Sequence, residues 1–173
     1  SIDWDFIWQG HQEIMSTFSK NGNKVLFIEN TGVRKPNIAD IHRLIKRGMN
    51  WFKSVRGFRE INSNLCVFSP IVLPFPYSKS AKFINKFVIM RSLNKWIKAV
   101  RFYDPIIWTY LPTGLVLDII NSLDKKLLVY YCVADFEELA ENPEKIKITE
   151  NKLIKQCDLV FVQVKSFKDK CNK

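Results

Sequence analysis

The sequence has few of the residues that mark fibrous, disordered or metal-stabilised chains. Its 173 residues include only six Gly and seven Pro, too few for a low-complexity or collagen-like chain. Four Cys occur without a C-x-x-C pair, and only two His accompany them. We therefore expect neither a zinc site nor a disulfide framework, but the reduced thiols of a cytoplasmic protein.

Long hydrophobic runs are also missing. Asp3 and Asp5 stand where a secretory signal would be basic and then apolar, so we expect no signal peptide. The 18 uncharged residues between Glu60 and Lys79 include three Pro, which excludes a regular helix across lipid. With 47% apolar residues, the chain is expected to form a single soluble domain, 1–173, with its own core.

The charge is unevenly distributed. Residues 34–101 hold 15 Lys and Arg against Asp40 and Glu60, a net charge of +13, and the rest of the chain has −3. Such a block indicates an anionic partner: nucleic acid, an anionic membrane surface or a phosphorylated substrate. A solvated basic surface that adds solubility is the alternative interpretation.

Short apolar runs alternate with longer helical patterns. The runs predict strands at 24–29, 65–69, 106–110, 127–132 and 158–163. The helical patterns fall at about 12–20, 38–52, 79–102, 113–123 and 143–156. This alternation predicts an α/β fold with a doubly wound parallel sheet of five or six strands and helices on both faces.

The segment 79–102 changes its apolar face midway. Phe83, Ile84, Phe87 and Val88 define one face, and the later apolar residues lie about half a turn away. We predict a helix break in residues 89–92. The alternative is an unbroken, two-faced helix that contacts a lipid or partner surface.

Ligands of open parallel sheets bind beyond the carboxyl ends of the strands. Five loops expected there are rich in aromatic, proline, amide and acidic residues: 3–11, 30–36, 69–78, 109–113 and 133–136. Such side chains suit a sugar, whose ring stacks on aromatic faces and whose hydroxyls bind carboxylates and amides. No G-x-G-x-x-G, P-loop or G-x-S-x-G motif is present, which disfavours dinucleotide, P-loop and α/β-hydrolase chemistry.

Six segments, in order, carry a resemblance to a known family. They are DWDFIWQ (3–9), KVLFIEN (24–30), PFPYS (74–78), WTYLPT (108–113), YCVADF (131–136) and DLVFV (158–162). Their order and spacing resemble the N-terminal Rossmann-like domain of GT-B glycosyltransferases of group 1 (family 4), in the branch that contains teichuronic-acid and surface-polysaccharide transferases.

The resemblance implies an acceptor-binding half of an enzyme. The nucleotide-sugar, a co-substrate, would be held by a C-terminal GT-B domain of the same parent chain, absent here. The resemblance further implies that no cofactor or metal is required. The expected acceptor is a sugar or a lipid-linked saccharide, at the inner face of the cell membrane, with the basic block against anionic lipid.

The candidate site residues come from these loops. The catalytic candidates are His11 and Asp135; the substrate-binding candidates are Trp4, Asp5, Trp8, Gln9, Arg34, Lys35, Tyr77, Tyr110 and Thr113. Alternatives remain open at this stage. His11 could be a polar residue without chemistry, Asp135 an N-cap, the two Trp packing residues, and the Arg34–Lys35 pair part of a solvated loop. A non-enzymatic domain that binds nucleic acid is the alternative function.

Overall fold

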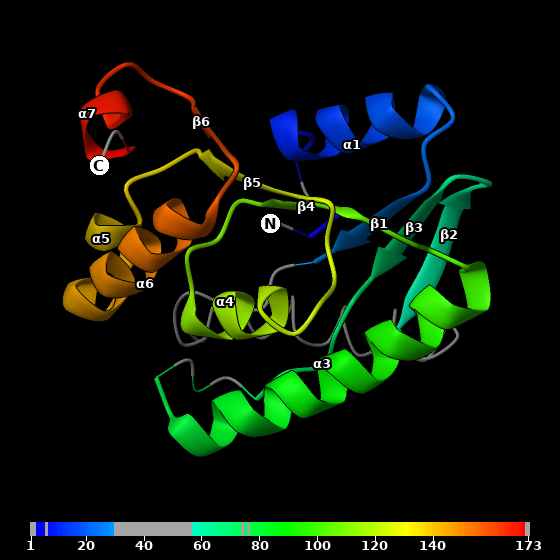
Figure 1. Ribbon diagram of the computed structural model, residues 1–173, viewed down its shortest axis with the longest axis horizontal. Coiled ribbons are helices and arrows are strands. Elements are labelled where there is room, and N and C mark those ends of the chain that lie inside the picture. The colour runs from blue at the N-terminus through cyan, green and yellow to red at the C-terminus, as the bar shows by residue number, and fades with distance from the viewer. Residues whose placement is uncertain (1–2, 6, 30–56, 74, 76, 172–173) are drawn as a thin grey trace. The chain divides into compact units, whose positions relative to one another are not determined.

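The computed structural model describes residues 3–5, 7–29, 57–73, 75 and 77–171 (Figure 1). The chain divides into two compact units, Ser1–Pro74 (unit 1) and Phe75–Lys173 (unit 2). The predicted helix at 38–52 lies outside the described residues.

Unit 1 contains one helix and a three-stranded sheet. Helix α1 (Gly10–Lys20) precedes β1 (Val25–Ile28), β2 (Phe58–Asn62) and β3 (Leu65–Phe68). The strand order is β1-β3-β2, with β1 parallel to β3 and β2 antiparallel to it. Strand β2 was not predicted and departs from the expected all-parallel arrangement. It is an exposed edge strand, so it lacks the continuous apolar run by which the other strands were found.

Unit 2 alternates strands and helices around a second sheet. The strands β4 (Ile106–Thr109), β5 (Leu127–Cys132) and β6 (Leu159–Val162) are all parallel, in the order β4-β5-β6. The helices are α3 (Lys79–Val100), α4 (Gly114–Ile120), α5 (Phe136–Leu139), α6 (Pro143–Gln156) and α7 (Phe167–Cys171).

All five predicted strands are confirmed, and the mixed α/β class with them. Among the described residues, the strands form two three-stranded sheets. The finer prediction, one doubly wound Rossmann-like sheet, stays a prediction.

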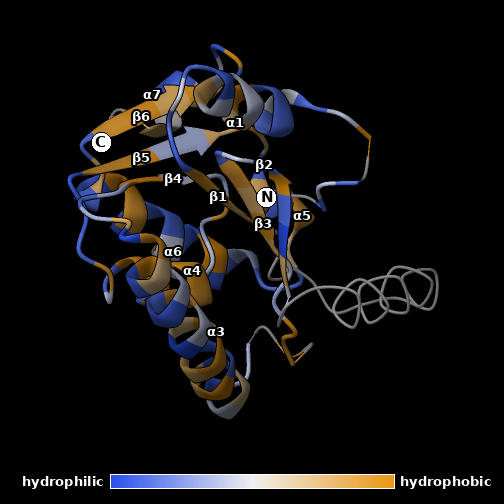
Figure 2. Ribbon diagram, turned by 90° about the vertical axis from the view of Figure 1, so that its right-hand side faces the viewer, coloured by the Kyte–Doolittle hydropathy of each residue, from blue (hydrophilic) through white to orange (hydrophobic). Residues whose placement is uncertain are grey.

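Helix α3 is unbroken, so the predicted break in residues 89–92 is wrong. The segment contains no Gly or Pro, and its ends are well defined: Ser78 accepts a hydrogen bond from the Ala81 backbone N–H, and Arg101 ends the helix in the left-handed region. Ala81, Asn85, Ile89 and Leu93 form one buried stripe at a spacing of four residues. The two apolar faces therefore belong to one continuous helix, along which hydrophobic and hydrophilic residues are interspersed (Figure 2).

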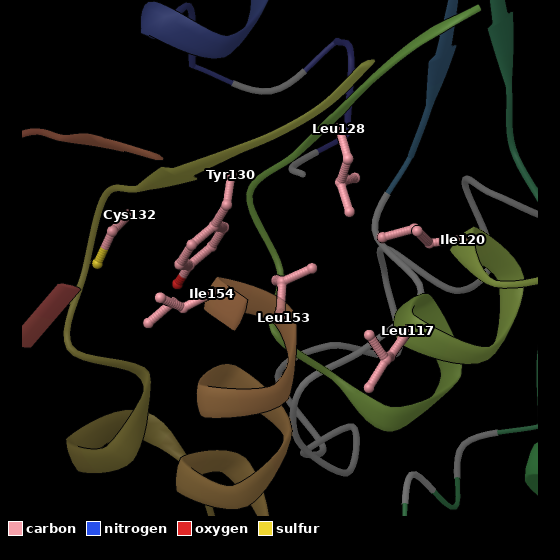
Figure 3. Close-up of a cluster of buried hydrophobic side chains, with 7 residues drawn as sticks. All are labelled: Leu117, Ile120, Leu128, Tyr130, Cys132, Leu153 and Ile154. Carbon is pink, nitrogen blue, oxygen red and sulfur yellow. The ribbon is translucent and has the colours of Figure 1, made fainter. Parts of the chain in front are cut away.

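The core of unit 2 lies between its sheet and the helices α4 and α6. Its fully or largely buried side chains are Leu117, Ile120, Leu128, Tyr130, Cys132, Leu153 and Ile154 (Figure 3). All four cysteines of the chain are free thiols, as predicted. Burial raises the pKa of Cys132 and of Cys157 to about 12, so both thiols stay protonated and act as packing residues.

One buried hydrogen bond links β5 to α6. The Tyr130 hydroxyl donates to Glu150 Oε1 at 2.5 Å, and both side chains are almost fully buried. Burial, together with the neighbouring carboxylate, raises the pKa of Tyr130 far above its ordinary value, so the phenol remains a donor. The bond gives one oxygen of the buried carboxyl group a partner, which offsets part of the cost of removing that group from water.

We therefore predict that Tyr130→Phe lowers the free energy of unfolding by about 1–3 kcal/mol, because it removes a donor from a buried carboxyl group. Urea denaturation measures the change. Tyr103→Phe, at a highly exposed position, is the matched control and should be neutral. Equal stabilities of the two variants would contradict the structural role of the Tyr130 hydroxyl.

Candidate functional site

The candidate site of unit 1 is built at the carboxyl edge of β1 and β3. The register pairs Ile28 with Phe68, so the next residues, Glu29 and Ser69, lie side by side at that edge. Both are buried. Their side chains are joined by a hydrogen bond from Ser69 Oγ to Glu29 Oε2 at 2.6 Å.

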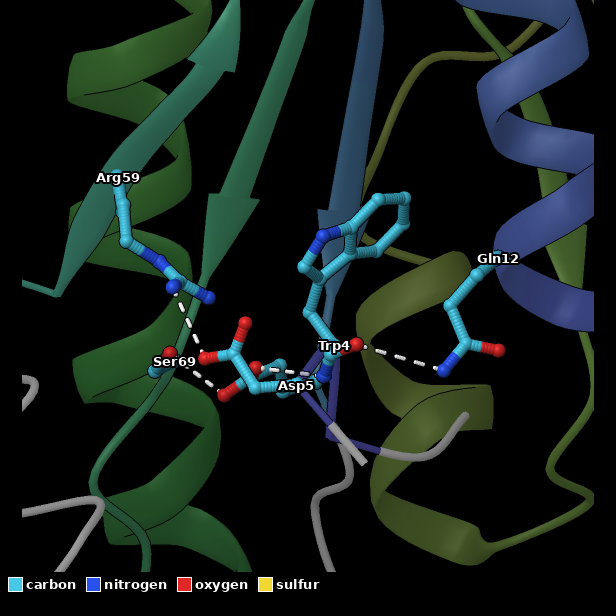
Figure 4. Close-up of polar contacts among 6 residues, drawn as sticks. Trp4, Asp5, Gln12, Arg59 and Ser69 are labelled. Atoms are coloured by element: carbon cyan, nitrogen blue, oxygen red, sulfur yellow. Dashed lines mark hydrogen bonds and ion pairs between the residues drawn. The ribbon is translucent and has the colours of Figure 1, made fainter. Parts of the chain in front are cut away.

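Glu29 also holds the loop that precedes α1. Its second oxygen, Oε1, accepts a hydrogen bond from the Trp4 backbone N–H at 2.8 Å (Figure 4). A buried carboxylate needs such partners, because the loss of hydration is otherwise uncompensated. The acidic residue at the end of β1 therefore holds the backbone of Trp4 at this edge of the sheet.

Gln12 fixes the same loop from the helix side. The side chain is fully buried, accepts from the Gln9 backbone N–H at 3.0 Å, and donates to the carbonyls of Trp4 and Ile7 at 3.5 and 3.4 Å. Gln9 is the N-cap of α1, and this pair forms a capping box. The predicted binding residue Gln9 thus lies, exposed, at the helix start.

Asp5 forms an ion pair with a residue of β2. Its Oδ2 lies 2.9 Å from Nη1 of Arg59, and each side chain keeps about a third or more of its surface exposed. The other guanidinium nitrogen of Arg59, Nη2, is buried and has no hydrogen-bond partner among the described residues. The pair therefore leaves Asp5 at the surface with a fixed orientation.

The two tryptophans take different positions. Trp4 is buried, with its ring edge-on to Phe27 at 4.9 Å between centroids, so it packs inside unit 1. Trp8 is 52% exposed. Its Nε1 donates to Glu13 Oε2 at 2.7 Å, and its ring meets Trp4 at 5.5 Å, which together orient the indole. Of the two tryptophans, Trp8 is therefore the one that can offer a ring face to a ligand.

His11 lies in the first turn of α1 and is half-buried. Burial lowers its pKa from 6.5 to about 4, because the charged imidazolium loses hydration. The imidazole is therefore neutral at neutral pH and can accept a proton or a hydrogen bond.

The candidates of unit 2 lie at the carboxyl edge of β4 and β5. Thr113 is buried and caps α4, accepting from the Val116 N–H at 3.4 Å. Asp135 caps α5, accepting from the Glu137 N–H at 3.1 Å. Tyr110 is buried with its ring 5.8 Å from Tyr131, and burial raises its pKa well above the ordinary value. The N-cap alternative for Asp135 is thus observed.

Tyr77 also belongs to unit 2, but it precedes α3 in the sequence, far from the loops that follow β4 and β5. Its hydroxyl accepts from the Asn142 N–H at 3.3 Å, and Lys145 Nζ lies 5.4 Å from its ring centroid. Arg34 and Lys35 lie outside the described residues. Asp5, Trp8, Gln9 and His11 all belong to unit 1, in the loop before α1 and in its first turn, whereas Tyr77, Tyr110, Thr113 and Asp135 belong to unit 2.

Sequence reasoning missed the residues that hold this site: Glu29, Ser69, Gln12 and Arg59. The one available signal was an acidic residue directly after an apolar strand, where burial demands a partner. No model of a protein family matches this chain, and no curated protein matches it. Within the described part of the chain, no group of His, Cys, Asp and Glu could hold a metal ion.

We predict that Glu29→Gln lowers the free energy of unfolding by about 1–3 kcal/mol and speeds hydrogen exchange of residues 3–9, because the amide cannot accept both bonds with the strength of a carboxylate. Hydrogen exchange read by mass spectrometry tests this. Glu60→Gln, on the exposed strand β2, is the control. Equal exchange of residues 3–9 in the two variants would contradict the role of Glu29.

We further predict a pH dependence that comes from His11. The pKa of His11 is about 4 in the folded chain, whereas an unperturbed His has a pKa of 6.5 in the unfolded chain. Between pH 4 and pH 6.5 the unfolded chain therefore binds one more proton than the folded chain. Stability should therefore fall as the pH is lowered from about 6.5 to about 4. NMR titration of the His11 ring measures the midpoint directly; a midpoint near 6.5 would contradict the burial of this imidazole.

Proposed function

We propose that the chain is the acceptor-binding half of a GT-B glycosyltransferase. The parent enzyme would transfer a sugar from a nucleotide-sugar to a lipid-linked or polysaccharide acceptor. In this proposal the chain forms the Rossmann-like, acceptor-binding domain of the parent enzyme. A C-terminal GT-B domain holds the nucleotide-sugar, and the reaction requires no metal.

One observation supports the proposal: the loop before α1 is held by hydrogen bonds to the backbone of Trp4, Ile7 and Gln9, and it leaves polar and aromatic side chains exposed. Glu29 and Gln12 hold its backbone. Trp8 offers an oriented, half-exposed indole, and Asp5 and Gln9 offer a carboxylate and an amide at the surface. An aromatic face beside such groups suits the apolar face and the hydroxyls of a sugar ring.

His11 is the first candidate for the catalytic group. Its lowered pKa keeps the imidazole neutral at neutral pH, so it can accept a hydrogen bond from the attacking hydroxyl. Asp135 is the second candidate, as a carboxylate at the carboxyl edge of β5. Closure of the C-terminal domain over a bound acceptor would exclude water during transfer.

The cellular location belongs to the same proposal. No helix within the described ranges is long and apolar enough to cross a membrane. A lipid-linked acceptor places the enzyme at the inner face of the cell membrane as a peripheral protein.

A nucleic-acid-binding domain is the second candidate, and the +13 block of residues 34–101 favours it. Such a domain would bind through a basic stripe with stacking aromatics and would ignore saccharides. Binding assays with saccharides and with duplex DNA therefore separate the two functions.

We predict that the chain binds octyl glycosides of glucose, galactose or N-acetylglucosamine, and that it binds UDP- or GDP-sugars at least about tenfold more weakly, because the proposal assigns the nucleotide-sugar to a separate C-terminal domain. Trp8→Ala should weaken glycoside binding about tenfold, whereas Trp8→Phe should retain most of it, since stacking needs only a ring face. Calorimetric titration measures both.

The control is Tyr103→Ala, which removes an exposed aromatic ring from unit 2. Its glycoside affinity should equal that of the unmodified chain. Micromolar binding of a nucleotide-sugar, or tight binding of duplex DNA without glycoside binding, would contradict the proposal.

A further inference from the structure

Helix α3 exposes large apolar side chains. Phe83, Ile84, Phe87 and Val88, here called the apolar patch, are 42–73% exposed. They lie on the side of the helix away from the buried stripe of Ala81, Asn85, Ile89 and Leu93. A soluble surface tolerates scattered apolar residues, but four adjacent ones on one helix face indicate a contact surface.

The charge of α3 has one sign. Its 22 residues include six Lys and Arg and no Asp or Glu. Three of them, Arg91, Lys95 and Lys98, are exposed. At 100° per residue they follow the apolar patch along the same side of the helix; they are here called the basic patch. The exposed side of α3 thus combines apolar and cationic groups without an acidic one.

This combination is complementary to an anionic bilayer. Amphipathic helices that lie in the membrane interface insert their apolar side chains at the level of the headgroups and pair their Lys and Arg with lipid phosphates. At 1.5 Å per residue, α3 is about 33 Å long, so it offers several turns to such a surface. Its buried stripe keeps it attached to the folded unit, as the ion pair of Lys82 with Asp118 of α4 also does at 2.9 Å.

We infer that α3 is a membrane-docking helix, whose apolar patch inserts into an anionic bilayer interface and whose basic patch binds the lipid phosphates. The inference extends the proposed function, since it identifies the element that attaches the chain to the membrane, but it does not depend on the glycoside site. Vesicle binding and glycoside binding are carried by different residues.

Other occupants fit the surface less well. A second copy of the chain would bring two α3 helices without acidic residues together, and their like charges would repel. Nucleic acid would bind the basic patch, but it would leave the side chains of Phe83 and Phe87 in water. Anionic lipid satisfies both patches at once.

The test is co-sedimentation of the full chain with vesicles of phosphatidylcholine, with and without 30% phosphatidylglycerol, at low and high salt. We expect binding to the anionic vesicles only, weakened several-fold by salt. Ile84→Asp should reduce this binding at least about tenfold, because it places a charge within the inserted patch. Ile148→Asp, the same substitution on the exposed side of α6, is the matched control and should change binding much less.

A second variant keeps the test valid if Ile84→Asp impairs folding. Lys95→Glu reverses a charge at an exposed position and should weaken anionic-vesicle binding about tenfold without affecting thermal stability. Equal losses with Ile84→Asp and Ile148→Asp would overturn the inference. So would equal binding to neutral vesicles, or binding of duplex DNA with none to anionic vesicles. Loss of glycoside binding alone would affect only the proposed function.

Discussion

The buried carboxylate of Glu29 is the constraint on which the candidate site depends. A carboxylate removed from water must be hydrogen-bonded, and Glu29 meets this need with the Trp4 backbone N–H and the Ser69 hydroxyl. The bonds join the end of β1, the end of β3 and the loop before α1. Trp8 lies in the same loop and is half-exposed. In unit 2, Glu150 imposes the same constraint and ties α6 to β5 through Tyr130.

Much of the fold could be predicted because it depends on local patterns. Buried parallel strands are continuous apolar runs, which is why β5 was found with its observed bounds, Leu127–Cys132. Strand β2 was not predicted, because an exposed edge strand has no continuous apolar run. The break expected in α3 was wrong for a related reason. A shift of the apolar face was interpreted as a change of structure, whereas the helix continues and leaves one apolar group exposed.

Only part of the candidate site could be predicted. Its exposed side chains are close together in the sequence, whereas the residues that hold them in place are far away in the sequence. Asp5, Trp8 and Gln9 were found because they share one short aromatic loop. Their partners are remote: Glu29 lies 25 residues from Trp4, Ser69 lies 40 residues from Glu29, and Arg59 lies 54 residues from Asp5. Periodicity and composition contain no information on such pairings, which arise only when the strands assemble.

The central claim, that the loop held by Glu29 binds a saccharide, is tested most directly by the indole N–H signals of the chain in nitrogen-15 NMR. There are five Trp, and the Trp8 signal can be assigned from the Trp8→Phe variant. On titration with octyl glycosides, the Trp8 indole signal should shift first and most, because its ring is the exposed one in the loop. Shifts confined to the tryptophans of unit 2, or no shift at saturating glycoside, would contradict the account.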